Sequence, residues 1–431
     1  MTATTNRPSF DLSQPGFRSS FFWMVVIALA LRLGVIVIGH TYNFKTADDN
    51  FSFGWEMGRI GRSLAEGQGF GNPFEGTTGP TAWEAPLYPF LIAGVFRTFG
   101  IYSHASALVL LAVNSVFSSL TCIPIFLIAR RCFGWKVATW SAWLWALLPS
   151  VLYWCTRWVW ETSLATLLLT LIFWRALVFE EKDGMARWLE FGLLWGVAAL
   201  TNPSLLSFLP ISTLWIWYCR GKRGKASVAG IFLSAGIVLL CIAPWTLRNY
   251  RVLGRFIPIR SNFGAELRLG NGSGANGLWL DYLHPSKNSH QLQLYRESGE
   301  IAYVAARKHE ALAYIRADWT RFFVLSFKRF VYFWDGLPAT SDSPAFGDLK
   351  NAIFLVSSVL AFCGLALALR KRRPAAGLFL GLILAYPAVY YVTFPHPRYR
   401  HPIEPELGVL MVYAIAEAMA DRDKSPRAAP S

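Results

Sequence analysis

The sequence predicts an all-α protein that crosses a membrane many times, with about 10–11 transmembrane helices. Of its 431 residues, 54% are hydrophobic and only 16% are charged, whereas soluble domains carry roughly 25% charged residues. Aromatic residues make up another 16%, and many stand at the ends of apolar runs, where amphipathic rings favour the membrane interface. This composition excludes an ordinary water-soluble fold.

Ten apolar segments are candidate spans, each of which needs roughly 20 helical residues. They are residues 20–40, 106–129, 136–154, 160–179, 188–202, 203–219, 226–246, 350–369, 374–394 and 404–420. The first segment follows a polar stretch and has no small-residue cleavage site, so we expect a retained helix. Between the fifth and sixth, Asn202–Pro203 is either a tight turn between two spans or a kink in one, because proline cannot donate to the helix ladder.

Positive charge predicts how these spans are oriented. Basic clusters occur at Arg130–Lys136, Lys182–Arg187, Arg220–Lys225, Arg370–Arg373 and Arg422–Lys424. Ten spans with both termini in the cytoplasm place every one of these clusters inside, as the positive-inside rule requires. Much of the formal charge of +15 is therefore interpreted as orienting charge, so we expect a multi-pass inner (plasma) membrane protein and no nucleic-acid partner.

Two large segments then lie on the outer face, residues 41–105 and residues 247–349. In the first, residues 55–65 have the pattern of a short amphipathic helix. Pro86–Phe99 is apolar but only about 14 residues long, so it is predicted to be an interfacial or re-entrant helix. In the second, His309–Trp334 has apolar residues at helical spacing among basic ones, which predicts an amphipathic helix on the membrane surface.

These assignments make residues 1–420 a single transmembrane domain. Residues 421–431 are short, polar and contain proline, so they are predicted to form a disordered cytoplasmic tail. Arg32 lies inside the first span, where it either snorkels to the interface or pairs with an acid of a neighbouring helix.

Acidic residues at outer helix ends are candidate catalytic groups. Asp48, Asp49 and Glu56 follow the first span, and Glu161 begins the fourth span at its outer end. A structural role is the alternative: the first three form a solvated charge cluster, and an acid at a helix N-terminus is stabilised by the helix dipole. The functional interpretation is a general base beside a phosphate-bearing substrate, because acids within the membrane are costly and more often functional.

Arginines on the outer side are candidate ligands for a donor phosphate. Arg248 ends the seventh span, Arg398 and Arg400 lie between the last two spans, and Arg59 lies in the first outer loop. Positive charge on this side does not orient the protein, and a guanidinium offers a bidentate fork that suits phosphate oxygens. Binding of ordinary anionic headgroups is the alternative.

The sequence predicts no metal site and no cofactor, although a divalent ion stays possible. His396 and His401 are five residues apart in a proline-rich loop, which is not the spacing of a helical metal pair. The six cysteines lie in or beside apolar runs with no metal-ligand spacing, so we interpret them as small buried apolar side chains.

Several motifs, taken in order, resemble those of GT-C-type glycosyltransferases. They are "SLAEGQGF", "GPTAWEAPLYPFL", "LPSVLYWCTRWVWETSLATLL", "ALTNPSLL", "APWTLRNYRVLGRFIPIRSNFGAELRLGNG" and "PHPRYRHPIEP". The resemblance covers most of residues 20–420. It is to the bacterial branch related to dolichyl-phosphate-mannose protein mannosyltransferases and lipid A aminoarabinose transferases.

This resemblance implies an inverting transfer of a sugar from a polyprenyl-phosphate carrier to an acceptor on the outer face. The implied partners are the lipid-linked donor, the bilayer, and an acceptor that is a protein, a lipid or a glycan. A first-loop acid is the implied base: Asp49 is favoured, Glu56 is close behind, and Asp48 also fits by position after the first span. Glu161 matches a second acidic position. Glu84 stands before "PLYP", where some relatives carry a lysine, so no phosphate contact is expected there.

The resemblance also implies that Arg248 and the two arginines of "RYR", Arg398 and Arg400, stabilise the leaving phosphate. Two other functions stay open. A transporter or flippase of a lipid-linked or small polar substrate would show internal repeats and a midplane site, and the sequence has no convincing repeat. A glycan ligase that uses a polyprenyl-diphosphate donor would also need outer arginine and histidine residues.

Overall fold

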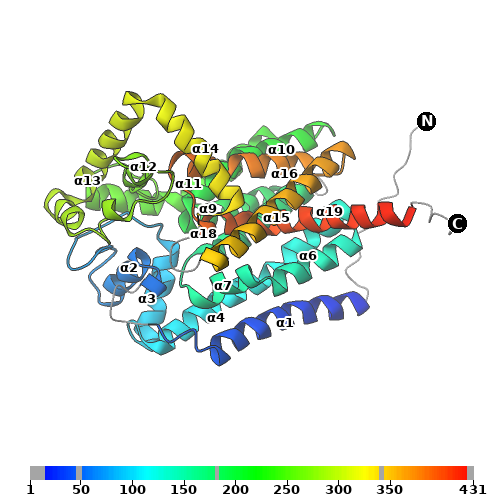
Figure 1. Ribbon diagram of the computed structural model, residues 1–431, viewed down its shortest axis with the longest axis horizontal. Coiled ribbons are helices and arrows are strands. Elements are labelled where there is room, and N and C mark those ends of the chain that lie inside the picture. The colour runs from blue at the N-terminus through cyan, green and yellow to red at the C-terminus, as the bar shows by residue number, and fades with distance from the viewer. Residues whose placement is uncertain (1–14, 45–50, 180–183, 339–343, 425–431) are drawn as a thin grey trace.

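A computed structural model describes residues 15–44, 51–179, 184–338 and 344–424 of the chain (Figure 1). These residues are almost entirely helical, and within them the only extended pairing is an isolated bridge between Gly71 and Pro80. The predicted all-α, polytopic membrane fold is confirmed.

Each of the ten predicted spans is helical. The corresponding helices are α1 (Pro15–Ile38), α4 (His104–Leu120) with α5 (Cys122–Phe133), α6 (Trp135–Leu147) with α7 (Pro149–Arg157), α8 (Thr162–Val178), α9 (Met185–Thr201), α10 (Leu209–Gly221), α11 (Val228–Leu253), α15 (Pro344–Arg370), α16 (Ala376–Ala385) with α17 (Ala388–Val392), and α19 (Glu404–Lys424). The outer segments contribute α2 (Glu56–Ala65), α3 (Leu87–Phe99), α12 (Phe263–Asn271), α13 (Ser289–Ala317) and α14 (Trp319–Asp335), and α18 (Pro397–Arg400) precedes α19.

Length varies among the helices of the spans. Among the described residues, three helical stretches are long and apolar enough to cross a membrane alone. They are His104–Phe133, which is α4 continued by α5, Val228–Leu253, which is α11, and Asn351–Arg370, which is the greater part of α15. Others are interrupted, because Pro149 and Pro387 lack the amide hydrogen that a continuous helix requires. The sequence pattern predicted where apolar segments lie, and prolines determine which of them are single helices.

The chain turns back on itself at Asn202–Pro203. Helix α9 ends at Thr201, a short 3₁₀ helix covers Pro203–Phe208, and α10 follows. The guanidinium of Arg220, at the end of α10, lies 5.9 Å from the rings of both Phe179 and Trp188. Because Trp188 is near the start of α9, α10 runs back alongside it, and the segment is a turn between two helices rather than a kink in one.

The basic loops gather at one end of the helix bundle. Lys371 and Arg373 both pair with Glu417 of α19, and Phe133 stacks on Tyr413 at 4.0 Å between centroids. Helix α1 begins and α19 ends at this end, while α2, α3, α12 and α13 lie at the opposite end (Figure 1). That the basic end faces the cytoplasm stays a prediction of the positive-inside rule.

Arg32 adopts neither of the two predicted arrangements. It is fully buried, and it donates to Ser118 Oγ at 3.1 Å and to the carbonyls of Ala28, Ala146 and Trp145 at 2.9–3.3 Å. These acceptors come from α1, α4 and α6. The guanidinium therefore ties three helices together through neutral oxygens, which satisfies its donors without an acid.

The outer helices lie on the bundle and on one another. Helix α3 packs against α2, α4 and α9, as expected for a segment too short to span alone. Around α3, the rings of Phe53, Tyr88 and Phe96 belong to one buried cluster with residues of α2 and α4. The predicted helix over 309–334 is wrong as a single element: it breaks at Asp318, whose side chain caps α14 by accepting from the amide of Arg321 at 2.8 Å.

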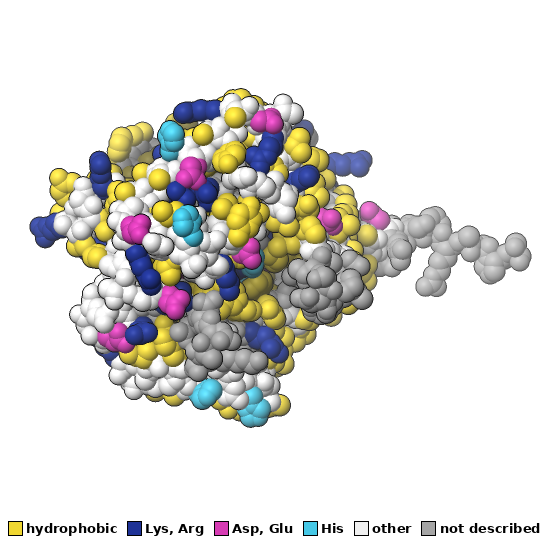
Figure 2. Space-filling view, turned by 60° about the vertical axis from the view of Figure 1, so that its left-hand side comes forward, with side chains coloured by type: hydrophobic (Ala, Val, Ile, Leu, Met, Phe, Trp, Pro, Cys, Tyr) yellow, Lys and Arg dark blue, Asp and Glu magenta, His cyan; other side chains and the backbone are white. Residues whose placement is uncertain are grey.

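Charged side chains of both signs mark the end that carries the outer helices. Figure 2 shows Lys, Arg, Asp, Glu and His side chains interspersed there among hydrophobic ones. On α14, Trp319, Phe323 and Phe327 are exposed along one face. This pattern agrees with the predicted amphipathic character of the segment.

Candidate active site

A cavity of about 1450 Å³ lies between the outer loops and the helix bundle. Its wall is built from both outer loops, the turn before α8, the turn after α9, and the segment that contains α18. The acidic residues, arginines and histidines in that wall are Glu56, Glu84, Glu161, Glu266, Glu404, Arg260, Arg398, His284 and His396. Residues more than 300 positions apart in the sequence therefore share one solvent-accessible space.

The structure brings three of the predicted site residues into this cavity: Glu56, Glu161 and Arg398. Asp48 and Asp49 lie outside the described residues, so their predicted role stays a prediction. Arg59, Arg248 and Arg400 belong to neighbouring elements but are not part of the described cavity wall. Their predicted contact with a donor phosphate also stays a prediction.

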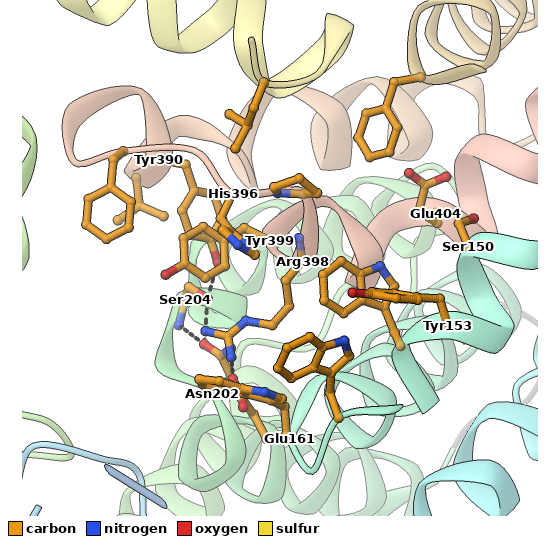
Figure 3. Close-up of a pocket in the computed structure, with 18 of the residues that line it drawn as sticks. Ser150, Tyr153, Glu161, Asn202, Ser204, Tyr390, His396, Arg398, Tyr399 and Glu404 are labelled. Atoms are coloured by element: carbon orange, nitrogen blue, oxygen red, sulfur yellow. Dashed lines mark hydrogen bonds between the residues drawn. The ribbon is translucent and has the colours of Figure 1, made fainter. Parts of the chain in front are cut away.

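Glu161 directly precedes α8, and the turn that follows α9 holds its side chain in place. Asn202 donates from Nδ2 to Glu161 Oε1 at 3.1 Å, and its own Oδ1 accepts from the hydroxyl of Ser204 at 2.6 Å. Ser204 in turn is hydrogen-bonded to the hydroxyl of Tyr390 at 2.8 Å. Glu161 is 4% exposed, and its Oε2 accepts no hydrogen bond from any described residue. Figure 3 shows this chain of contacts.

Arg398 reaches into the same region from α18 (Figure 3). The segment is shaped by His396, whose Nδ1 accepts from the amide of Arg398 at 3.2 Å. The guanidinium carbon lies 3.5 Å from the ring centroid of Trp160 and 5.3 Å from that of Tyr399. One terminal nitrogen is buried without an acceptor among the described residues. The arginine is thus fixed by aromatic faces, with hydrogen-bonding capacity left for a ligand.

Glu56 lies on another part of the wall, at the start of α2. It is 5% exposed and accepts from the hydroxyl of Ser286 at 3.0 Å. His284 Nε2 is 3.6 Å from the same oxygen, Glu56 Oε1. The preceding residue, Trp55, has a φ of 46°, which is strained for a bulky side chain and is often found at functional sites.

The carboxyl group of Glu84 contacts the guanidinium of Arg260 in the cavity wall. Arg260 donates to the carbonyl of Trp83 at 2.9 Å and to Glu84 Oε1 at 3.1 Å. Burial raises the pKa of Glu84 to about 8, and although Arg260 opposes this rise, Glu161 and Glu56 add to it. This position thus carries an acid with an arginine partner, and the expectation about a phosphate contact at residue 84 stays a prediction.

Glu266 is the fourth carboxyl group of this region. It lies on α12 and accepts from Asn262 Nδ2 at 2.9 Å. Burial raises the pKa of Glu266 to about 7, with Arg260 opposing the rise. The guanidinium groups of Arg260 and Arg398 thus favour the ionised forms of Glu84 and Glu266, but burial outweighs them and the pKa of each carboxyl group stays raised.

Arg248 and Arg400 have structural partners. Arg248 donates to the carbonyls of Thr81 and Phe70 at 2.5 and 2.6 Å, and so anchors the first outer loop to α11. Arg400 is 1% exposed as a side chain and pairs with Glu404 at 2.7 Å. The two arginines of "RYR" therefore differ in surroundings: Arg398 faces the cavity, whereas Arg400 lies against α14 and α15, where it donates to the carbonyl of Trp334 and to Ser358.

Sequence reasoning missed the site roles of Arg260, Glu266, His284 and Asn202. The break at Asn202–Pro203 was a visible signal, because an asparagine before proline at a helix end is well placed to present its amide. His284 follows a one-turn 3₁₀ helix in an irregular loop. No periodicity marks its position, so only the tertiary structure shows its proximity to Glu56.

The cavity continues into an apolar part between helices of the bundle. Residues of α6, α7, α15 and α19 line it, among them Leu144, Leu148, Ile353 and Met411. Ile353 is exposed, so the apolar part is open at α15. One space thus joins a polar end with carboxylates and Arg398 to an apolar end that faces the expected lipid.

The described part of the chain holds no group of three or more His, Cys, Asp or Glu residues that could bind a metal ion. Several carboxyl groups share the cavity, but their partners are Asn202, Ser286, Arg260 and Asn262. The chemistry available from these residues is proton transfer by carboxyl groups and binding of an anion by Arg398.

Comparison with known proteins supports the predicted resemblance. Residues 83–247, less than half of the chain, match the sequence model of the family "dolichyl-phosphate-mannose-protein mannosyltransferase". No curated protein matches the sequence. The chain is thus confirmed to resemble glycosyltransferases of the GT-C type.

Solved structures of an archaeal oligosaccharyltransferase share the fold at low sequence identity. The archaeal oligosaccharyltransferase AglB from Archaeoglobus fulgidus, in complex with an inhibitory peptide and a dolichol-phosphate, is 15% identical with a TM-score of 0.58, over 97% of this chain and 53% of that chain. The Archaeoglobus fulgidus oligosaccharyltransferase in complex with Zn and sulfate is 15% identical with a TM-score of 0.56, over 93% and 50%. ArnT from Cupriavidus metallidurans bound to undecaprenyl phosphate is 12% identical with a TM-score of 0.42, over 95% and 80%. The chain thus spans about half the length of the archaeal enzyme whose fold it shares.

Proposed function

We propose that this protein is an inverting glycosyltransferase that moves a sugar from a polyprenyl-phosphate carrier to an acceptor on the non-cytoplasmic face of the membrane. One observation carries the proposal: a single cavity joins an apolar part, open at α15, to a polar end that contains Arg398, Glu56 and Glu161. A lipid-linked donor has this same division between an isoprenoid tail and a phosphosugar.

The apolar part is suited to the carrier lipid. Leu144, Leu148, Ile353 and Met411 offer aliphatic surface, and burial of a lipid chain gains about 0.8 kcal/mol per methylene. A tail that enters beside α15 keeps its remaining isoprene units in the bilayer. The phosphate then reaches the polar end of the cavity, beside Arg398.

Arg398 has the properties required for the leaving group. As the bond between C1 of the sugar and the phosphate oxygen breaks, the electron pair goes to that oxygen and the phosphate gains negative charge. A guanidinium that is already fixed against Trp160 stabilises this charge without having to reorganise. The free hydrogen-bonding capacity of its terminal nitrogen is directed to the phosphate.

A carboxylate completes the reaction. The acceptor hydroxyl attacks C1 from the face opposite the phosphate, so the configuration inverts, and its proton passes to a carboxylate. Among the described residues the first outer loop places two carboxyl groups in the cavity, Glu56 and Glu84. Glu84 is held by Arg260 and burial raises its pKa to about 8, so Glu56 is the candidate base of the two, and Asp49 and Asp48 stay the candidates predicted from sequence. Glu161, with an open Oε2, is proposed to orient a sugar or acceptor hydroxyl.

The test is transfer by purified protein in detergent or nanodiscs. Radiolabelled polyprenyl-phosphate sugars are offered with envelope protein, lipid and glycan acceptors, and release of polyprenyl phosphate is measured. We expect sugar transfer that Arg398→Ala abolishes and that Arg97→Ala, at an exposed arginine of α3, preserves. No transfer from any monophosphate carrier would refute the proposal, and transfer from diphosphate carriers alone would favour the ligase alternative.

A further inference from the structure

The turn that contains His284 brings the second outer loop close to Glu56, one of the candidate bases. Residues 281–288 cross from α12 toward α13, and the backbone here is anchored by its own hydrogen bonds: the amides of Lys287 and Asn288 donate to the carbonyl of His284 at 2.9 and 3.0 Å. His284 is 5% exposed and lines the cavity. A histidine held this firmly presents a defined edge of its ring.

The tautomer of His284 follows from its hydrogen bonds. Nδ1 accepts from the amide of Ser286 at 3.2 Å, so this nitrogen carries no proton. In a neutral imidazole the proton is then on Nε2. That nitrogen is 3.6 Å from Glu56 Oε1, so the ring presents an N–H to the carboxylate.

Aromatic rings hold the imidazole in this orientation. Trp55 stacks on His284 with an interplanar angle of 11° and a centroid distance of 6.1 Å. Phe74 and Trp83 meet it edge to face at 5.7 and 6.2 Å, and Trp279 lies at 5.8 Å. The ring cannot rotate away without displacing these neighbours, and Trp55 is the strained residue directly before Glu56.

We propose that His284 is a positioning residue for Glu56: its Nε2–H, together with the hydroxyl of Ser286, holds the Glu56 carboxylate in the orientation that accepts the proton of the acceptor hydroxyl. This inference rests on the proposed function. It assigns to the second outer loop the completion of a site that begins in the first. His284 transfers no proton itself, because Nδ1 faces the Ser286 amide and not solvent.

Other charged groups near Glu56 set the background for a pH measurement. Among the described residues they are His284, Lys287, whose Nζ lies 4.9 Å from the ring centroid of Trp55, and the carboxyl groups of Glu84 and Glu266, which interact electrostatically with Glu56. None of these other groups is altered when His284 is replaced. A change in the acidic limb of the pH profile on replacement of His284 is therefore a direct readout of the His284–Glu56 contact.

The variants are His284→Ala, His284→Gln and the control His290→Ala, which removes an exposed histidine of the same loop. We expect His284→Ala to lower kcat about 10- to 100-fold with little change in the KM for donor. Its acidic limb of kcat/KM moves to higher pH, because a carboxylate that loses a donor is a weaker acid. Glutamine places an N–H near the position of Nε2 and restores at least part of kcat, while His290→Ala behaves as wild type.

A double-mutant cycle with Glu56→Gln separates positioning from a merely structural role. If His284 acts through Glu56, His284→Ala has no further effect on kcat in the Glu56→Gln background. Additive losses, or an unchanged kcat and acidic limb in His284→Ala, overturn the inference. Failure of the proposed function is a different result, in which wild-type protein transfers no sugar. A fully active Glu56→Gln variant in a protein that does transfer sugar leaves the transferase proposal standing and overturns the inference about His284.

Wild type, the two single variants His284→Ala and Glu56→Gln, and the double variant also test the contact without a measurement of activity. Their thermal unfolding midpoints in one detergent give the His284–Glu56 coupling directly. We expect the midpoint shifts of the two single variants to be non-additive. Additive shifts show that the two side chains do not interact, which overturns the inference even when no substrate has been found.

Discussion

Replacement of the buried carboxyl group of Glu84 by an amide is expected to change how the stability of the protein depends on pH. Glu84 is 5% exposed, and burial raises its pKa from 4.5 to about 8. A carboxyl group whose pKa is raised in the folded state binds more protons there than in the unfolded state. The free energy of unfolding therefore falls as pH rises from about 4.5 to about 8, and it is constant with respect to this group outside that window.

The magnitude follows from the same values. The difference between about 8 and 4.5 is about 3.5, and each pKa unit corresponds to roughly 1.4 kcal/mol. Ionised Glu84 thus lowers the free energy of unfolding by on the order of 5 kcal/mol above pH 8, and by about 3 kcal/mol at pH 7. Glu84→Gln mimics the protonated acid and removes this dependence. In this variant Glu266, whose pKa is raised to about 7, still gives the free energy of unfolding a smaller dependence on pH.

Thermal unfolding of the purified protein between pH 5 and 9, followed by tryptophan fluorescence, measures the effect. We expect Glu84→Gln to resemble wild type at pH 5 and to exceed it in midpoint at pH 8.5. The control is Glu75→Gln, at an exposed carboxyl group of the same loop, and its pH dependence is expected to match wild type. If Glu84→Gln loses as much stability as wild type over this range, the carboxyl group is not protonated in the folded state, and the reasoning is refuted.

Three further outcomes are expected. Arg398→Lys lowers kcat about 10- to 1000-fold with folding intact, because one ammonium cannot reproduce the bidentate fork; a fully active lysine variant would contradict this. Glu161→Gln keeps the hydrogen bond to Asn202 in its amide oxygen and loses the free carboxylate oxygen, so kcat/KM falls at least tenfold while the unfolding midpoint holds; equal loss of both would indicate a structural role. Arg248→Ala removes the donors to Phe70 and Thr81, costs about 2–4 kcal/mol, and accelerates proteolysis of the first outer loop; an unchanged cleavage rate would exclude that anchoring role.

The sequence alone determined the membrane class and the position of the helices. Hydrophobic segments of about 20 residues have few alternatives in a bilayer, where every backbone group must be paired within the segment. For that reason the ten segments are helical in the structure, and the basic loops of the predicted inner side lie together. Motif order also indicated the glycosyltransferase resemblance, and helix ends indicated Glu56, Glu161 and Arg398.

The sequence pattern does not determine which groups each arginine contacts. Arg32, Arg248 and Arg400 satisfy their donors with carbonyls, hydroxyls or Glu404, whereas Arg398 extends along Trp160 into the cavity. A guanidinium has five donors and a flexible stem, so its partners depend on which backbone oxygens come within reach after the helices have packed. That information is absent from the local sequence.

The site as a whole belongs to the tertiary structure. The first outer loop supplies Glu56, the second supplies His284 and Arg260, and the segment before α19 supplies Arg398. Hydrophobicity is a property of each segment, so the sequence predicted that these loops lie on the same side of the helix bundle. The distances between side chains of different loops depend on how the helices pack. Contacts between distant parts of the sequence therefore decide them, as for Glu56, whose Oε1 lies 3.6 Å from Nε2 of a histidine 228 residues further along.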